Sequence, residues 1–301
     1  MGTRILLTGV TGQVGGELAR TLAPLGEVVA PTREDLDLTN ASSIRDVIQA
    51  VQPRWIVNPA AYTAVDKAES EPDLAYAINA GAPKVIGEEA RRIRAGVIHF
   101  STDYVFSGEG LRPYMETDAT GPVSVYGASK LAGEEALAAS GAGYLVFRTS
   151  WVYGSTGKNF LRTILKAARD RDRLRVVADQ HGAPTWSRDL ARMTAHVIGR
   201  IESEASDRDL HGALDRRKGI YHASGAGETT WFGFAQQAVA MLQERDPQAK
   251  LAEVDAITTA EYPTPAKRPE NSRLNCEKLV SSFGWKMMDW RDSLREVMAD
   301  L

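Results

Sequence analysis

Apolar residues in the first half of the chain alternate between short runs and longer stretches with helical spacing. The short runs predict five strands, over 4–8, 28–30, 55–58, 97–101 and 144–149. The amphipathic stretches predict helices over 13–25, from Ser42 or Ser43 to about Val51, from Pro72 to Arg94, and over 123–139. This alternation is typical of right-handed βαβ units. We therefore expect an α/β fold of the Rossmann type, a doubly wound parallel sheet with helices on both faces.

Beyond Trp151 the alternation loosens, and helices are expected over 159–169, 187–200, 230–242 and 290–298. We predict a dinucleotide-binding domain made of 1–150 and about 175–228. A smaller C-terminal substrate-binding lobe would comprise about 151–174 and 229–301. The polar segment 202–218 predicts a surface excursion. Segment 262–273 contains three prolines and three cations, which predicts an ordered, extended loop.

Composition narrows the class of protein. Of 301 residues, 43% are hydrophobic and 25% are charged, as in ordinary globular proteins. The net charge is −3 and the short basic clusters lie near acidic residues, so nucleic acid is not an expected partner. No stretch reaches the roughly 18 apolar residues of a membrane span. One cysteine excludes an intrachain disulfide, and the scattered histidines predict no metal site. We expect a cytoplasmic protein with no membrane partner.

A glycine-rich segment follows the first predicted strand and precedes the first helix. It has the spacing G-x-x-G-x-x-G, which lets a backbone turn tightly beside a pyrophosphate at a helix N-terminus. A turn without a ligand is the alternative, but this position in a βαβ array favours a dinucleotide. The predicted cofactor-binding residues here are Gly9, Gly12, Gln13, Val14 and Gly15.

The end of the second predicted strand bears on which dinucleotide binds. Where an acid often holds the ribose, the chain has Thr32 and Arg33, a hydroxyl and a cation that suit a 2′-phosphate. We therefore expect NADPH rather than NADH, with a solvated Arg33 as the alternative. Asp37 and Leu38 are expected near the adenine, and an ordinary turn is the other interpretation of Asp37.

The candidate catalytic residues are Thr102, Tyr126 and Lys130. Thr102 lies at the C-terminal end of the fourth predicted strand, where doubly wound sheets bind ligands. Tyr126 and Lys130 have the i, i+4 spacing that places two side chains on one helix face. A nearby ammonium stabilises a phenolate, so Lys130 is expected to lower the pKa of Tyr126. Y-x-x-x-K alone is a weak signal, but together with the glycine turn it predicts proton transfer at a carbonyl.

Longer stretches connect these motifs over nearly the whole chain. They are Gly-Gln-Val-Gly at 12–15, NPAAYTAVDKAE at 58–69, STDYVF at 101–106, VYG at 125–127, RTSWVY at 148–153, DQHGAPT at 179–185, and YPTP at 262–265 with Arg268-Pro269 and Asn271-Ser272. On these residues the chain resembles the extended short-chain dehydrogenase/reductase family and, within it, the dTDP-4-dehydrorhamnose reductases.

The resemblance implies that the C4 ketone of dTDP-4-dehydro-6-deoxy-L-mannose is reduced by NAD(P)H to dTDP-L-rhamnose, in dTDP-rhamnose biosynthesis, with Tyr126 as proton donor. It also implies that the cofactor is lined by Ala61, Tyr62 and Thr63, besides Tyr126 and Lys130. The sugar would face Thr102, Asp103, Tyr126 and Trp151. The diphosphate or thymidine would meet Asn159 and the loop from Arg268 to Arg273. Core packing of Trp151 and a solvated cationic loop are the alternatives.

Two other kinds of protein keep this fold. A non-catalytic NADP-binding subunit, like the regulatory subunit of methionine adenosyltransferase, is disfavoured by the intact Thr102, Tyr126 and Lys130. A sugar-nucleotide dehydratase would show an Asp-Glu pair after Thr102, whereas Asp103 is followed by Tyr104; an epimerase or another sugar-nucleotide reductase is also an alternative.

Some relatives form a Mg²⁺-linked dimer through glutamates. Glu17 matches one such position, but Arg188 stands where a second is expected. We therefore expect a monomer or a homodimer without a bridging metal.

Overall fold

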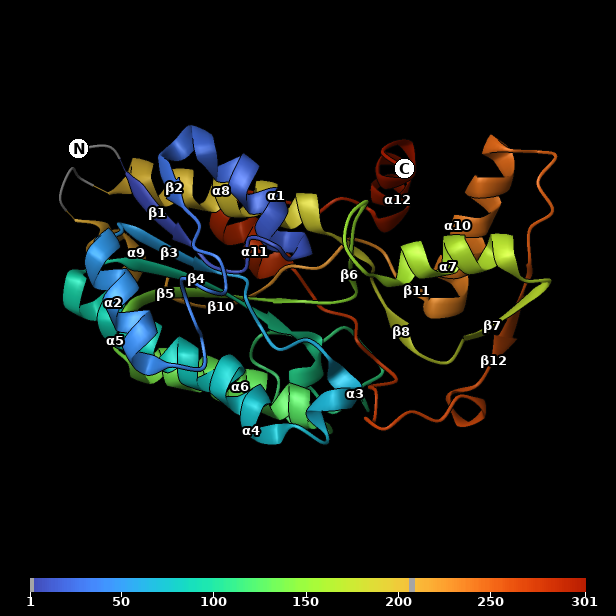
Figure 1. Ribbon diagram of the computed structural model, residues 1–301, viewed down its shortest axis with the longest axis horizontal. Coiled ribbons are helices and arrows are strands. Elements are labelled where there is room, and N and C mark those ends of the chain that lie inside the picture. The colour runs from blue at the N-terminus through green and yellow to red at the C-terminus, as the bar shows by residue number, and fades with distance from the viewer. Residues whose placement is uncertain (1–2, 206–208) are drawn as a thin grey trace.

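A parallel sheet forms the centre of the molecule in the computed structural model, which describes residues 3–205 and 209–301. The order of its six strands is β2-β1-β3-β4-β5-β10, and every neighbouring pair is parallel. The strands are β1 (Arg4–Leu7), β2 (Glu27–Val29), β3 (Trp55–Asn58), β4 (Gly96–Thr102), β5 (Gly143–Thr149) and β10 (Gly219–His222). The expected doubly wound α/β fold is confirmed (Figure 1).

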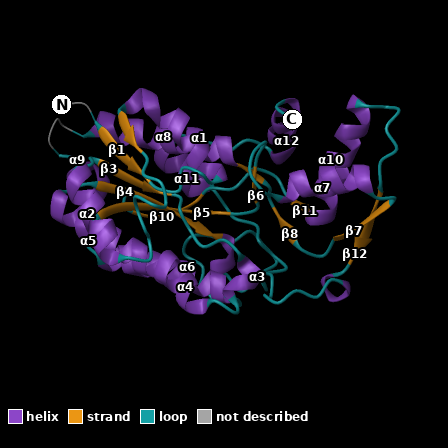
Figure 2. Ribbon diagram, viewed as in Figure 1, coloured by secondary structure: helices purple, strands orange, loops and turns teal. Residues whose placement is uncertain are grey.

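Helices cover both faces of the sheet, as Figure 2 shows. One face packs against α1 (Gln13–Leu22), α8 (Ser187–Glu204) and α11 (Glu277–Phe283), the other against α2 (Ala41–Val51), α5 (Ala82–Ile93) and α6 (Val125–Ala139). Strand order reverses at β1, because β2 lies on one side of it and β3 on the other. In such sheets the crevice at the carboxyl ends of the strands next to the reversal is where ligands bind.

The boundaries of three predicted helices differ from expectation. Helix α2 is capped by Asn40, whose Oδ1 accepts from the Ser42 and Ser43 amides at 2.9 and 3.4 Å, so neither serine is the cap. The first helix ends in a 3₁₀ turn at Ala23–Leu25. The single helix expected from Pro72 is divided into α4 (Pro72–Tyr76), a π-helical turn at Ala77–Gly81 and α5, with the short α3 (Val65–Ala68) before it.

Elements of the second half form a separate group at one end of the sheet (Figure 1). Its helices are α7 (Phe160–Asp170), α10 (Trp231–Arg245) and α12 (Trp290–Ala299). Strand β7 (Arg173–Val177) pairs in parallel with β12 (Glu253–Ile257), while β6 (Val152–Tyr153) pairs with β9 (Thr185–Trp186) and β8 (His181–Gly182) with β11 (Thr229–Thr230). Leu161, Phe234 and Trp290 share one apolar core. The exact residue limits of the two domains stay a prediction.

Helix α9 (Leu210–Asp215) differs from the surface excursion that was predicted over 202–218. It buries Leu210 and Leu214 in the core beside the sheet, and β10 follows as the sixth strand. Residues 206–208 of that segment lie outside the described residues. Between Glu261 and Cys276 the chain has no helix, in agreement with the extended loop predicted over 262–273.

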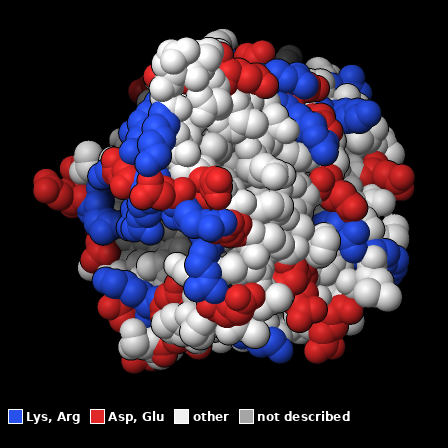
Figure 3. All heavy atoms as spheres, turned by 90° about the vertical axis from the view of Figure 1, so that its right-hand side faces the viewer, with Lys and Arg blue, Asp and Glu red and all other residues white. Residues whose placement is uncertain are grey.

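No helix within 3–205 or 209–301 combines the length and the apolarity needed to cross a membrane. Figure 3 shows the end of the molecule formed by the second half of the chain, where side chains of both charge signs are interspersed around a broad uncharged area. That face therefore carries no large patch of one sign.

Candidate active site

The glycine turn is held in a shape that only glycine accepts at two positions. Gly9 has φ +60°, and an added Cβ would lie 3.0 Å from Ala60. A Cβ on Gly15 would lie 2.0 Å from the Gly9 carbonyl oxygen, so the first turn of α1 packs directly on the turn that precedes it. Gly12 is the N-cap of α1 and supplies no side-chain cap. The first amides of α1 are thus open to an anion, as a pyrophosphate site requires.

Gln13 joins this turn to the second half of the chain. Its Oε1 accepts from Asn159 Nδ2 at 2.9 Å. Asn159 is buried, and its Oδ1 caps α7 by accepting from the Arg162 amide at 3.0 Å. The structure therefore brings Asn159 to the glycine turn, with its carboxamide already engaged by protein atoms.

Arg33 and Asp37 lie on the exposed loop after β2. Asp37 Oδ1 accepts from the Thr39 amide and hydroxyl at 2.8 and 2.7 Å, and these bonds, helped by the charge of Arg33, lower the pKa of Asp37. Asp37 is therefore an ionised turn residue, and Leu38 packs against the core beneath it. Arg33 is open to solvent beside the turn, where a phosphate could reach it.

Thr102 and Asp103 lie buried at the carboxyl end of β4. The Thr102 hydroxyl donates to Asp103 Oδ1 at 2.9 Å and also accepts from the Tyr104 amide at 3.2 Å. Burial is the main influence on Asp103 and raises its pKa to about 6, against hydrogen bonds from Ser272 and Thr102 that lower it. A carboxyl group that is easily protonated thus stands next to a hydroxyl at the edge of the crevice.

Tyr126 lies in the first turn of α6, and its phenol is close to the Thr102 hydroxyl. Burial raises the pKa of Tyr126 to about 12, although the hydrogen bond with Thr102 lowers it. The ring stands edge-on to Tyr104, with 5.6 Å between centroids. The expectation that Lys130 lowers this pKa was wrong: desolvation of the phenolate is the larger effect, and in this structure the Lys130 amine is bound elsewhere.

The Lys130 amine donates to the carbonyl oxygen of Phe100 at 2.5 Å and lies 3.3 Å from His99 Nε2. Burial lowers the pKa of Lys130 to about 8, against the charge of Glu134, which raises it. His99 in turn contacts Asn58 through Nδ1 at 3.1 Å. The sequence analysis missed both His99 and Asn58. A polar residue inside an otherwise apolar strand was the signal that could have found them.

The segment after β3 carries Ala61, Tyr62 and Thr63, which follow Ala60, the residue that lies against Gly9. Asn79 holds this segment with two bonds: its Oδ1 accepts from the Tyr62 amide at 2.8 Å and its Nδ2 donates to the Tyr62 carbonyl at 3.0 Å. Asn79 also donates to Ser129 on α6. Since Asn79 sits in the π-helical turn, the irregular helix has a specific positioning role that sequence spacing did not indicate.

Trp151 lies two residues after the end of β5 in a left-handed conformation, with φ +47°. Its indole stacks on Trp231 at 3.7 Å with an interplanar angle of 13°. A Cβ on Gly182 would lie 2.6 Å from the same indole. The indole of Trp151 is fixed and partly exposed, and its backbone is strained, a combination that is common where a ligand packs against a protein.

The two arginines of the cationic loop are paired with acids. Arg268 donates to Asp66 at 3.1 and 2.8 Å, and Arg273 to Glu228 at 2.8 Å. Arg273 is further fixed by Asn271 Oδ1 at 2.8 Å. Burial raises the pKa of Tyr104, and the nearby charge of Arg268 acts against this rise, so the guanidinium lies on the same side of the molecule as Tyr126.

Comparison with known proteins decides the family. Residues 3–301 match the family described as the RmlD substrate binding domain. The chain belongs to this family. A dTDP-4-dehydrorhamnose reductase of Burkholderia thailandensis is 45% identical over 300 residues, which cover 99% of each chain. The expected kinship with these reductases is confirmed, and with it the class of NAD(P)-dependent oxidoreductases.

Solved structures agree with this membership of the RmlD family. A dTDP-4-dehydrorhamnose reductase from Clostridium acetobutylicum superimposes with a TM-score of 0.88 at 36% identity, over 99% of both chains. The corresponding reductase from Bacillus anthracis, solved in complex with NADP, gives a TM-score of 0.88 at 33% identity over 100% of both chains. The similarity therefore extends over both halves of the fold.

In this RmlD-family chain, Arg188 occupies the position where the sequence analysis considered a second glutamate. It contacts Glu17 at 3.2 Å and Asp300 at 2.8 Å, joining α1, α8 and the C-terminal end of α12. Within 3–205 and 209–301, no three acidic, histidine or cysteine side chains are arranged to hold a metal ion. Arg188 thus places a fixed cation between two carboxylates.

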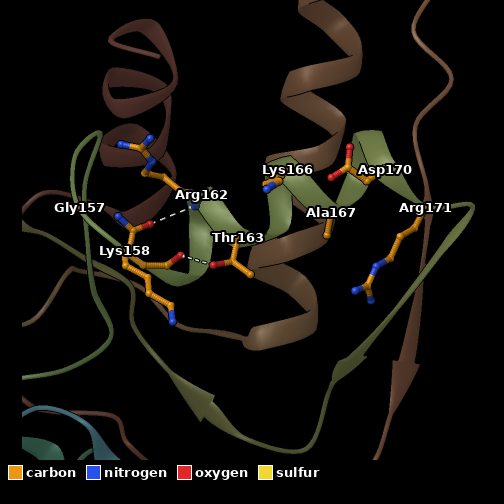
Figure 4. A pocket seen from close by; sticks show the side chains of 9 residues that line it. Gly157, Lys158, Arg162, Thr163, Lys166, Ala167, Asp170 and Arg171 are labelled. Atoms are coloured by element: carbon orange, nitrogen blue, oxygen red, sulfur yellow. Dashed lines mark hydrogen bonds between the residues drawn. The ribbon is translucent and has the colours of Figure 1, made fainter.

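A separate hollow of about 640 Å³ lies along α7 (Figure 4). It is lined by Lys158, Arg162, Lys166 and Arg171 together with Asp170, and Asn159 caps the helix at its edge. None of the predicted catalytic residues lines it. Asn159, which was predicted to meet the diphosphate or thymidine, is among its lining residues.

Proposed function

We propose that this chain reduces the C4 ketone of dTDP-4-dehydro-6-deoxy-L-mannose to dTDP-L-rhamnose with NADPH, and that Tyr126 donates the proton. The observation that carries the proposal is the meeting of Thr102, Asp103 and Tyr126 at the carboxyl edge of the sheet, in a chain related over its full length to the named reductases. A dTDP-sugar is accordingly the proposed substrate, and dTDP-rhamnose biosynthesis the proposed pathway.

The glycine turn fits a dinucleotide on physical grounds. Because Gly12 leaves the start of α1 without a side-chain cap, free amides and the positive end of the helix dipole face the anion. When bound, the reduced nicotinamide supplies a hydride to the carbonyl carbon. We assign the residues that hold the cofactor as Gly9, Gly12, Gln13, Val14, Gly15, Arg33, Asp37, Leu38, Ala61, Tyr62, Thr63, Tyr126 and Lys130.

The proton follows from the state of Tyr126. A ketone oxygen becomes an alkoxide during reduction and needs a proton. A phenol whose pKa is about 12 stays protonated throughout the neutral range, so it can donate but does not ionise beforehand. The Thr102 hydroxyl lies close to the phenol, and we propose that it donates a hydrogen bond to the same substrate oxygen. Lys130, one helical turn on, is proposed to hold the nicotinamide ribose.

The remaining polar groups are assigned to the substrate. Asp103 and Trp151 are proposed to face the hexose, and Asn159, Arg268 and Arg273 the diphosphate or thymidine. The ion pairs of Arg268 with Asp66 and of Arg273 with Glu228 keep both guanidinium groups ordered before the nucleotide arrives. Binding would exchange a carboxylate partner for a phosphate, a pairing for which the planar guanidinium is well suited.

The test is a spectrophotometric assay of the purified protein. NADPH should be oxidised only when the dTDP-4-keto sugar is present, and dTDP-glucose, which has no ketone, is the matched control. The product should run with dTDP-L-rhamnose in chromatography. Consumption of NADPH that does not depend on the keto sugar would remove the substrate assignment.

A further inference from the structure

Four buried polar side chains form a continuous chain from the catalytic helix to the glycine turn. The Lys130 amine contacts His99 Nε2 at 3.3 Å, His99 Nδ1 contacts Asn58 Nδ2 at 3.1 Å, and Asn58 Oδ1 accepts from the Thr8 hydroxyl at 2.6 Å. Each of the four is at most 2% exposed. Thr8 immediately precedes Gly9, so the chain ends where the proposed cofactor turn begins.

The imidazole in the middle restricts how these bonds are directed. Burial, and then the charge of Lys130, hold the pKa of His99 well below its usual value, so the ring is neutral at neutral pH. A neutral imidazole has one N–H and one lone pair, and therefore donates at one nitrogen and accepts at the other. It cannot accept from Asn58 and Lys130 at the same time.

Two directions of the bonds are consistent with a neutral imidazole between Asn58 and Lys130. In the first, Thr8 donates to Asn58 Oδ1, the Asn58 amide donates to His99 Nδ1, and His99 Nε2–H donates to a neutral Lys130 amine. In the second, a charged Lys130 donates to His99 Nε2, Nδ1–H donates to Asn58 Oδ1 after the carboxamide turns over, and Asn58 Nδ2 donates to Thr8. The second state holds one more proton, which is taken up from solvent at Lys130.

We propose that His99 is a positioning residue for Lys130, and that its tautomer couples the charge of the Lys130 amine to the direction of the Thr8 hydroxyl beside the glycine turn. The proposal rests on the proposed function only in taking Lys130 and the glycine turn as parts of one cofactor site. It extends that function by making proton uptake at Lys130 and cofactor binding depend on one another.

The groups around the Lys130 amine set the pH range in which it changes between its charged and neutral states. Glu134 on α6 is the charged group that favours the ammonium, and its own charge is matched by the buried Arg148 on β5, 2.6 Å away. On the β4 side, His99 and the Phe100 carbonyl face the amine. Burial outweighs Glu134 and brings the pKa of Lys130 to about 8, so both states are populated near neutral pH.

The first experiment is NMR of the protein without cofactor, with ¹⁵N in the five histidines and ¹³C in the lysines. Between about pH 6 and about pH 10 the His99 ring should change from Nδ1–H to Nε2–H, with the same midpoint as the Lys130 Cε signal. Lys130→Met identifies that signal by its loss and should abolish the tautomer change. A His99 tautomer that stays constant while Lys130 titrates would overturn the proposal.

Two variants separate positioning from simple packing. His99→Gln sets a carboxamide near the Nε2 position and keeps a partner for Lys130, whereas His99→Asn sets one near Nδ1 and keeps only the Asn58 contact. The dissociation constant for NADPH should rise about tenfold in His99→Asn and remain near wild type in His99→Gln. Equal losses of NADPH affinity in both variants would mean that His99 contributes only by packing.

These outcomes are distinct from failure of the proposed function. The NMR titration needs neither substrate nor turnover, so a protein that does not reduce the keto sugar can still show the coupled midpoint. Conversely, wild-type reductase activity together with an invariant His99 tautomer would reject the proposed coupling between His99 and Lys130 and leave the proposed function intact. Thermal unfolding of each variant shows whether a change in affinity reflects the site or the fold.

Discussion

The Thr102 hydroxyl donates to Asp103 Oδ1 across 2.9 Å, so the last residue of β4 and the residue that follows it act as one hydrogen-bonded unit. The same hydroxyl lies close enough to the Tyr126 phenol to act against the burial that raises the pKa of Tyr126. A single threonine therefore joins the easily protonated carboxyl group on one side to the strongly protonated phenol on the other. The proton-donating side of the site is therefore formed by Thr102 and Asp103 at the end of β4 and by Tyr126 of α6.

Tyr126→Phe should lower kcat by about 10² to 10⁴ and leave the dissociation constant for NADPH nearly unchanged, because only the donated proton is lost. Stopped-flow kinetics and cofactor fluorescence measure the two quantities. Tyr104→Phe is the matched control, since Tyr104 packs edge-on against the same ring. Comparable losses in both variants would contradict a specific role for the Tyr126 hydroxyl.

Arg33→Ala should raise KM for NADPH and leave KM for NADH unchanged, because only the former has a 2′-phosphate to pair with the guanidinium. Steady-state kinetics with each cofactor test this. Arg295→Ala, on the exposed side of α12, serves as the control for loss of a surface cation. A wild-type preference for NADH would refute the assignment of Arg33.

Gly15→Ala should abolish tight NADPH binding, since its Cβ would lie 2.0 Å from the Gly9 carbonyl and push the turn away from α1. Gly16→Ala is a control from the same helix, where the nearest atom would be 3.4 Å away. Removing a helical glycine there should stabilise the protein by about 0.5 to 1 kcal/mol. Isothermal titration and urea unfolding distinguish the two; equal cofactor affinities would show that close packing at Gly15 is not needed.

Arg148→Met should destabilise the fold by about 3 to 5 kcal/mol, because Glu134 would keep a buried charge without its partner. Adding Glu134→Leu should recover much of the loss. Urea unfolding gives both free energies. The half-exposed pair of Arg54 and Glu202 offers the comparison, and its Arg54→Met variant should cost far less. If the double variant is no more stable than Arg148→Met, the unpaired charge of Glu134 is not the cause of the destabilisation.

The pKa of Asp103 predicts a dependence of stability on pH. Its folded value, about 6, is above the ordinary 3.8, so between these values the folded state binds more protons than the unfolded state. Its contribution to stability therefore falls as pH rises from about 4 to about 6, by up to about 3 kcal/mol, and is constant above that. Asp103→Asn should remove this slope from the urea unfolding curves. If the pH dependence of the unfolding free energy is unchanged in Asp103→Asn, a group other than Asp103 is responsible for it.

Local sequence patterns predicted the strands and the glycine turn well, because these features depend on spacing within a few residues. Gly9, Gly12 and Gly15 stand where a strand passes into a helix, and the structure retains that arrangement. Strand β10, Gly-Ile-Tyr-His, was missed because it is defined by its pairing with β5, which is distant in the sequence.

The electrostatics of the site could not be predicted from spacing. Tyr126 and Lys130 share a helix, but the amine is drawn to the Phe100 carbonyl and His99, partners that only the folded sheet supplies. Burial then raises the pKa of the phenol, the opposite of the expected direction. Asn79 escaped notice for the same reason, since its partners lie after β3 and on α6.

The position of β10 also affects how the molecule assembles during synthesis. Gly219 pairs with Leu145, so β5 remains an open edge until most of the chain has left the ribosome. Its exposed backbone groups could meanwhile pair with a strand of another nascent chain. We expect truncation before residue 219 to yield aggregates, and the arrival of this short strand to be a late step in folding.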